Sequence, residues 1–175
     1  AWDRSCRTGK SSAILSRRRT TPFLTYAVAI TDAQQAGVIG QFLVNDFERE
    51  IATTVKVIEA AQGGHLDYRP DAKSKTGLGL VRLWAIEDEW MLNCIADGQF
   101  VLPPDDSDAC SIMNAEDAAA CYRERVPPAL ERLRALSAEQ LAATIDLMGI
   151  MPLPVAGILA MAAKHSVHHR GQLSS

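Results

Sequence analysis

Apolar residues recur every three or four positions along four long stretches of the chain, and this spacing predicts four amphipathic helices. The helices are expected over about 36–61, about 76–96, from Asn114 to about 136, and from about Pro154 to the C-terminus. Gly63-Gly64 should end the first of them. The inward-facing stripes are Ile39, Leu43, Phe47, Ile51, Thr54 and Ile58 in the first, Leu80, Trp84, Glu87, Met91 and Cys94 or Ile95 in the second, and Val155, Ile158, Ala162, His165, His169 and Gln172 in the last.

The segments between these helices carry further signals of where helices start and stop. Asn114 is a predicted N-cap, and Pro127-Pro128 should kink or split the third helix because proline removes a backbone donor. The capping-box pattern from Ser137 to Gln140 predicts a short connecting helix to about Leu147, with a turn over 149–154. No alternating strand pattern is present. The predicted fold class is therefore all-α, a four-helix bundle with a short extra connecting helix.

Composition and charge divide the chain into an arm and a body. Six of the 18 basic residues but only two of the 21 acidic residues fall in 1–35, which we interpret as a basic extension with a partly ordered lead-in. Residues 36–175 then form one domain with an acidic balance, which argues against nucleic acid as a partner. The longest apolar run, from Leu147 to Ala163, contains two prolines and is shorter than the ~20 residues that a membrane span needs.

Cysteine usage favours a reducing compartment. Cys6, Cys94, Cys110 and Cys121 are far apart in the sequence and form no CxxC pair. Reduced thiols in a cytoplasmic protein are the simplest interpretation of this spacing.

The candidate chemistry lies in the last helix. His165 and His169 are four residues apart, so their imidazoles stack on one helix face and could share a divalent metal ion. Zinc, nickel and iron all accept neutral imidazole ligands. In the second helix, Glu87 interrupts an otherwise apolar stripe, and a carboxylate there must be paired, protonated or bound to a cation. His168 is expected off this face, in solvent, and Arg170 is expected at the surface, as a possible partner for a carboxylate.

The string HSVHHRGQL at residues 165–173 resembles the C-terminal signature of the DinB/YfiT-like family, in which this helix supplies two metal ligands. The stretches 66–70 with Lys73-Ser74, 87–90 and 96–100 resemble other parts of the family, so the resemblance covers roughly 37–175. It implies an up-down-down-up four-helix bundle that is often a dimer. Many members bind a divalent metal through three histidines, and those of known activity are mostly metal- and thiol-dependent transferases or isomerases.

The sequence departs from this pattern at the third ligand. The position that matches the family's histidine on helix two is Leu83, which cannot bind a metal. Glu87, one turn later, is the first candidate to replace it and would give a set of two histidines and one carboxylate. Asp88 and His65 are the other candidates, and a site without a third protein ligand also remains open.

Two hypotheses for function follow. In the first, a zinc, nickel or iron ion held by His165, His169 and Glu87 supports transfer of a low-molecular-weight thiol, or hydrolysis, on a small-molecule substrate in a homodimeric enzyme. In the second, the bundle has lost its full metal site at Leu83 and serves as a non-catalytic binding or stress-associated module. An ordered ion near His165 and His169 together with a solvent pocket would favour the first, and a filled core with Leu83 packed against the two rings would favour the second.

Overall fold

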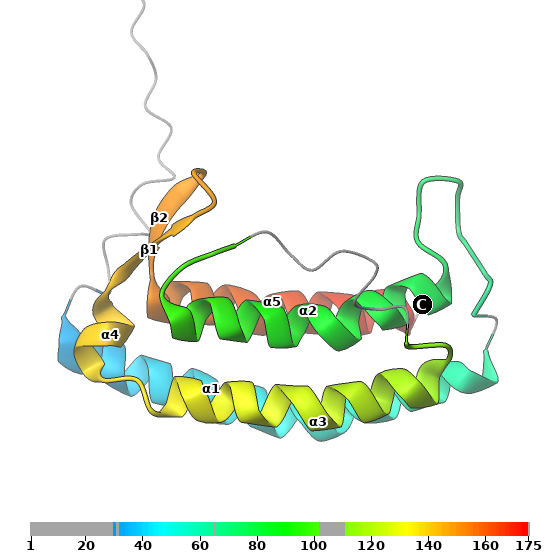
Figure 1. Ribbon diagram of the computed structural model, residues 1–175, viewed down its shortest axis with the longest axis horizontal. Helices are drawn as coiled ribbons and strands as arrows, with labels where there is room; N and C mark the ends of the chain where they lie inside the picture. Colours follow the sequence, from blue (N-terminus) through cyan, green and yellow to red (C-terminus); the bar gives the residue numbers. More distant parts are fainter. Residues whose placement is uncertain (1–29, 31, 65, 102–110, 175) are drawn as a thin grey trace, which may run out of the picture.

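The computed structural model describes residues 30, 32–64, 66–101 and 111–174, and four long helices in this part pack side by side (Figure 1). They are α1 (Ala33–Ala60), α2 (Gly77–Asp97), α3 (Ala115–Arg134) and α5 (Val155–Leu173). A short 3-10 helix η2 (Ala61–Gly63) extends α1, and a short helix α4 (Ala138–Ala142) follows α3. The predicted four-helix bundle with a short connecting helix is confirmed.

The helices follow the predicted up-down-down-up order. α1 packs beside α3 and α5, and α2 packs beside the same two helices, so α1 and α2 occupy opposite corners. In Figure 1, α1 and α5 run in one direction and α2 and α3 run in the other. Because α2 and α3 are parallel, the chain must return along the length of the bundle between Asp97 and Ala115.

Side-chain caps fix where several of these helices begin. The Asp32 carboxylate accepts a hydrogen bond from the Gln35 amide, and the Asn114 side chain accepts one from the Asp117 amide, as predicted for Asn114. Both halves of the capping box at Ser137 are present. Gly98 ends α2 in a left-handed conformation with φ of 72°, which glycine adopts without steric cost.

The buried face of α1 is rotated from the predicted stripe. Phe47, Thr54 and Ile58 are buried as expected, whereas Ile39, Leu43 and Ile51 are only partly buried. The face instead includes Ala36, Gly40 and Val44. The cause is α4, which packs on the first half of α1. A Cβ atom at residue 40 would lie 2.8 Å from both terminal methyl carbons of Leu141, so glycine lets the two helices approach closely.

The predicted split of the third helix is wrong, because α3 runs unbroken through Pro127 and Pro128. In an α-helix, the amides that these prolines lack would bond to the carbonyls of Arg123 and Glu124. Both of those residues are exposed, so water can satisfy their carbonyls and the helix continues.

The segment expected to be helix and turn is a β-hairpin. α4 ends at Ala142, and β1 (Thr144–Leu147) pairs antiparallel with β2 (Met151–Pro154). Met148 and Gly149 between them have positive φ angles of 52° and 74°, and the Asp146 carboxylate accepts the Gly149 amide. The two-stranded ribbon tolerates Pro152 and Pro154 because both of its strands are edges.

Several predictions concern residues at the limits of the described part. The basic extension up to residue 29 and His65 lie outside it, as do Cys6 and Cys110. Cys94 and Cys121 are free thiols, and burial raises the pKa of both. None of the described helices is long and apolar enough to cross a membrane.

The contact between Leu141 and Gly40 predicts the effect of truncating Leu141. Leu141 is 1% exposed, so Leu141→Ala should leave a cavity and lower the free energy of unfolding by ~2–5 kcal/mol, measured by urea denaturation. Leu147→Ala is the matched control, because Leu147 is only partly buried and its truncation should cost clearly less. Equal losses in the two variants would contradict this role for α4.

Candidate metal centre

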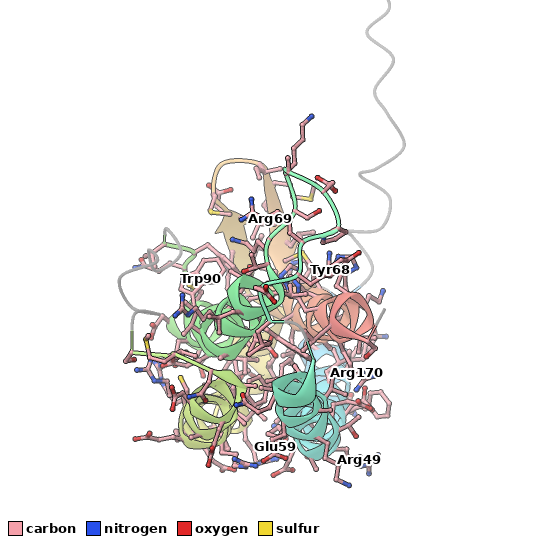
Figure 2. The ribbon with its side chains drawn as sticks, turned by 90° about the vertical axis from the view of Figure 1, so that its right-hand side faces the viewer. Arg49, Glu59, Tyr68, Arg69, Trp90 and Arg170 are labelled. Atoms are coloured by element: carbon pink, nitrogen blue, oxygen red, sulfur yellow. The ribbon has the colours of Figure 1, made fainter. Side chains whose placement is uncertain are left out.

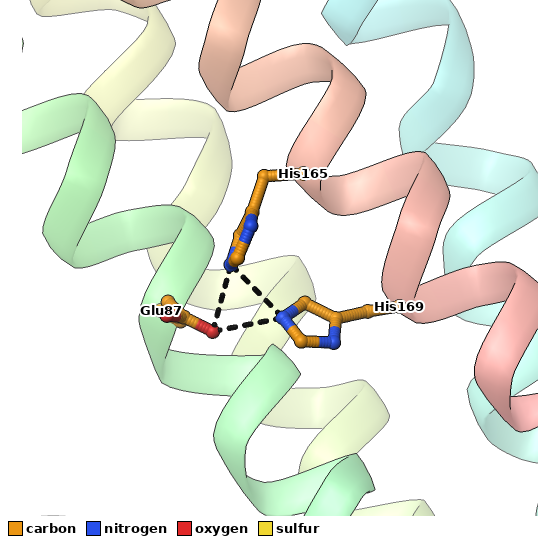
Figure 3. Close-up of side chains that lie close together, drawn as sticks. All are labelled: Glu87, His165 and His169. Atoms are coloured by element: carbon orange, nitrogen blue, oxygen red, sulfur yellow. Dashed lines mark hydrogen bonds and ion pairs between the residues drawn. The ribbon is translucent and has the colours of Figure 1, made fainter.

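Three donor atoms from α2 and α5 converge on one point between the helices (Figure 3). The Nε2 atoms of His165 and His169 are 2.9 Å apart. The Oε2 atom of Glu87 lies 3.2 Å from His165 Nε2 and 3.0 Å from His169 Nε2. Of the described candidates for the third ligand, Glu87, the first choice, is therefore the one that lies beside the histidine pair.

Helix geometry accounts for this arrangement. His165 and His169 lie one turn apart on α5, with ring centroids 4.4 Å apart and ring planes nearly perpendicular. α2 packs directly against α5 and presents Glu87 to both rings. The His169 side chain is 8% exposed and that of Glu87 is 18%, whereas that of His165 is 34%. His165 is thus the most exposed of the three side chains, and His169 is the least exposed.

The separations fit a single divalent ion. Ligand atoms at about 2.0–2.2 Å from one ion lie about 2.8–3.6 Å from their neighbours in octahedral or tetrahedral geometry. The three separations here, 2.9, 3.0 and 3.2 Å, fall in that range. The donor set of two imidazoles and one carboxylate matches zinc, nickel or iron. The Glu87, His165 and His169 group could therefore hold a metal ion, and their assignment as ligands stays a prediction.

Gln172 sets the tautomer of His169. Its Oε1 atom lies 2.9 Å from His169 Nδ1 and can only accept, so Nδ1 must carry a proton and donate it. In the neutral ring Nε2 then bears a lone pair, which points toward His165 and Glu87. This outer hydrogen bond prepares the ring as a ligand, as second-shell partners do in known metal sites. Gln172 lies on the helix face predicted for it, and its role toward His169 depends on side-chain geometry that helix periodicity does not specify.

The charges in the group support each other when no ion is bound. Burial raises the pKa of the Glu87 carboxyl, but hydrogen bonds with His169 and His165 outweigh burial and hold that pKa below its ordinary value. The hydrogen bond to Glu87 raises the pKa of His169, against the opposing effect of burial. Without a metal, the charged Glu87 carboxylate and a protonated His169 thus stabilise each other.

The structure does not bring Asp88 into the donor group. Asp88 is 2% exposed, and its Oδ2 atom accepts hydrogen bonds from the hydroxyls of Tyr122 and Ser166. Burial raises the pKa of this carboxyl to about 6, although both hydrogen bonds lower it. His168 is exposed and Arg170 pairs with the Glu50 carboxylate, as predicted for these two residues of the motif.

A cavity of about 820 Å³ adjoins the group at the end of the bundle where α1 passes into α2. His169 and Gln172 line one side of it, and residues of the 64–77 segment line the other. Apolar side chains form much of its wall, among them those of Leu66, Leu80, Leu83 and Leu173. Leu83 is thus a partly buried wall residue of an open cavity, one turn from Glu87. Figure 2 shows the 66–77 segment, with Tyr68 and Arg69 labelled, beside the ends of α2 and α5.

Comparisons with known proteins identify a family and a similar solved structure. The model of a family described as the DinB superfamily matches residues 46–173. The crystal structure of a DinB-like protein, YjoA, from Bacillus subtilis is similar with a TM-score of 0.58 and 22% identity, covering 75% of this chain and 85% of that one. No curated protein matches this chain. At this identity the structural likeness establishes the fold alone.

The shifted pKa values of Glu87 and His169 predict how this pair contributes to the stability of the metal-free protein at different pH. Because the pKa of Glu87 is lowered in the folded protein, its charged carboxylate stabilises the fold at pH values above the unfolded pKa of 4.5. This stabilisation is lost as the pH falls through the folded pKa. Because the pKa of His169 is raised in the folded protein, its protonated ring stabilises the fold at pH values below the unfolded pKa of 6.5. This stabilisation is lost as the pH rises through the folded pKa.

Glu87→Gln should therefore lower the melting temperature most between pH 4.5 and 6.5, and less on either side. Thermal melts with a chelator from acid to mildly alkaline pH would measure the difference between the wild type and the variant. A difference that stays constant across this range would show that the Glu87 and His169 charges are not coupled.

Proposed function

This chain belongs to the DinB superfamily, and from that premise and the converging donors we propose that it binds a divalent metal ion through Glu87, His165 and His169 and acts on a small molecule in the adjoining cavity. The observation that carries the proposal is the mutual separation of 2.9–3.2 Å among one carboxylate oxygen and two imidazole nitrogens. Three Lewis-basic atoms so close together need a cation or a shared proton between them.

The donor set suits a catalytic rather than a closed structural site. Structural zinc sites use four protein ligands, whereas catalytic sites use three and leave a position for water or substrate. Among the described residues, the group contains three donors, and one of them, His169, lines the cavity. Two neutral histidines and one carboxylate would leave a bound divalent cation with net positive charge. A bound ion would act as a Lewis acid that lowers the pKa of a thiol or of water.

The residues around this position have separable roles. Gln172 holds the Nδ1 proton of His169 and so keeps Nε2 available as a ligand. Glu87 supplies the negative charge, and the helices α2 and α5 fix the three donors on rigid elements. Leu80 and Leu83 line the same cavity as His169 and contribute to its apolar wall.

The cavity indicates the kind of substrate. Its volume of about 820 Å³ lies in the ~300–1,000 Å³ range of small-molecule sites. The described part of its lining contains Lys75 but no aspartate or glutamate, which favours a ligand with an apolar body and a neutral or anionic group. We propose that the reaction is transfer of a low-molecular-weight thiol, the co-substrate, to an electrophilic atom of such a ligand. Hydrolysis of the ligand is the alternative reaction.

The alternative of a non-catalytic bundle rests on the loss of a histidine at Leu83. A filled core with Leu83 packed against the two rings would favour that hypothesis, whereas Leu83 lines an open cavity shared with His169. The cavity therefore favours the enzyme. The homodimer and the cytoplasmic location stay predictions.

Removal of a donor tests the metal site. Glu87→Ala, His165→Ala and His169→Ala should each weaken zinc binding by more than the ~10–100-fold that loss of an outer partner costs. Elemental analysis and competition titration of the purified protein would measure this. His168→Ala is the matched control, because His168 is exposed and outside the donor group, and it should bind zinc like the wild type. Equal binding by all four variants would place the ion elsewhere.

A second variant separates the cavity from the metal. Leu83→Trp should fill the cavity beside His169 while leaving the three donors intact, so it should retain the metal but lose turnover. The assay is metal-dependent consumption of aryl electrophiles by a panel of small thiols, with ester hydrolysis in parallel. Unchanged turnover in the metal-loaded variant would rule out this cavity as the substrate site.

A further inference from the structure

A second polar cluster lies directly behind the metal-binding group, in the core of the bundle. It includes Trp84 and Asp88 from α2, Tyr122 from α3 and Ser166 from α5, and the buried Thr54 of α1 adjoins Tyr122. The exposed fractions of the first four are 0%, 2%, 0% and 5%. Four hydrogen-bonding side chains are thus nearly sealed from water where three helices meet. The metal-binding role proposed above assigns no function to any of them.

The chemistry of these side chains fixes the direction of the hydrogen bonds from Trp84 to Ser166 and from Ser166 to Asp88. The Trp84 indole can only donate, so at 3.0 Å the Ser166 hydroxyl must accept from it. Ser166 therefore directs its own proton at Asp88 Oδ2, at 2.6 Å. The Tyr122 hydroxyl donates to the same oxygen at 2.7 Å. Ser166 is held from two sides by α2, once as acceptor and once as donor.

This cluster is coupled to the metal-binding group through the backbone. Ser166 directly follows His165 and lies three residues before His169 on α5. Asp88 directly follows Glu87 on α2. A rotation or slide of α5 that separates Ser166 from Asp88 would also move both imidazoles away from Glu87. The hydrogen bond between Ser166 and Asp88 therefore constrains the same degree of freedom on which the donor separations depend.

Simple stabilisation does not explain why this position is polar. Burial of a carboxylate and two hydroxyls costs desolvation free energy, and well-packed apolar side chains would hold the helices together at lower cost. Ridges of apolar side chains, however, permit several registers of one helix against another, whereas a directional hydrogen bond permits one. The cluster trades stability for a defined register of α5 on α2.

We propose that Ser166 and Asp88 are positioning residues, whose buried hydrogen bond sets the register of α5 on α2 and thereby holds Glu87, His165 and His169 at metal-binding separation. This inference rests on the proposed function for its consequence in metal binding. Its structural content, the placement of the imidazoles relative to Glu87, can be tested without a metal.

The test compares two variants that each remove one hydrogen bond from the same oxygen. Ser166→Ala removes both hydrogen bonds that join Ser166 of α5 to α2, the one from Trp84 and the one to Asp88, whereas Tyr122→Phe removes the bond between α2 and α3. Both variants leave the carboxyl of Asp88 with one fewer donor, and both lose a buried hydroxyl. An effect of stability or of the Asp88 charge should therefore appear in both, and an effect of register should appear in Ser166→Ala alone.

Cobalt(II) is the probe, because its visible absorption reports ligand geometry as well as occupancy. We expect Ser166→Ala to bind cobalt about 10–100-fold more weakly than the wild type, with a shifted absorption band. Tyr122→Phe should keep the affinity and the band of the wild type even where its melting temperature falls. Wild-type affinity and band in Ser166→Ala, or equal changes in both variants, would overturn the proposal.

A metal-free measurement keeps this inference separate from the proposed function. The imidazole ¹⁵N chemical shifts of His165 and His169, recorded with a chelator at one pH, report their hydrogen bonds to Glu87. These shifts should change in Ser166→Ala and stay at wild-type values in Tyr122→Phe. If the wild-type protein binds no cobalt, the proposed function fails, and the shifts alone decide whether Ser166 positions the imidazoles: identical shifts in all three proteins would overturn it.

Discussion

The contact between α2 and α5 is the constraint on which this structure depends, because it buries nearly all of the polar chemistry in the bundle. Glu87 and Asp88 enter it from one helix and His165, Ser166 and His169 from the other. A carboxylate removed from water must find a partner, and each of these two carboxylates finds one on the opposite helix. The two partnerships differ in kind. Asp88 is satisfied by hydroxyl donors, whereas Glu87 faces two nitrogens that can bear either a proton or a metal ion.

That difference links the site to pH and to its ligand. A proton on the imidazoles and a divalent cation compete for the same lone pairs, so metal affinity must rise as the histidines lose their protons. The lowered pKa of Glu87 favours the charged carboxylate, and the raised pKa of His169 makes the competition between proton and metal extend to higher pH. The cavity beside His169 brings a substrate to the same point, and its wall on the far side is the segment that joins α1 to α2. Donors on rigid helices and a wall on a connecting segment are a common division of labour in enzymes.

Local sequence determines much of this fold and part of the site. Helix periodicity placed His165 and His169 on one inward face, and a lone carboxylate in an apolar stripe identified Glu87 as needing a partner. The caps at Asn114 and Ser137 were equally local signals. The hairpin at 144–154 was missed because its strands are four residues long and one contains two prolines. The pairing of Asp88 with Ser166 could not be predicted, because these residues are 78 positions apart in the sequence. Their contact depends on how α2 and α5 are rotated against each other. The buried face of α1 depended in the same way on a distant contact, that of Gly40 with Leu141.

The most direct test of this account is a crystal structure of the protein with a saturating divalent metal, with anomalous diffraction data collected at the absorption edge of that metal. The account predicts one anomalous peak at about 2.0–2.2 Å from Oε2 of Glu87 and from Nε2 of both His165 and His169. It also predicts that Asp88 stays bonded to Ser166 behind the ion. A peak bound by other residues, or none at this position under saturating metal, would contradict the claim that these three side chains form a metal centre.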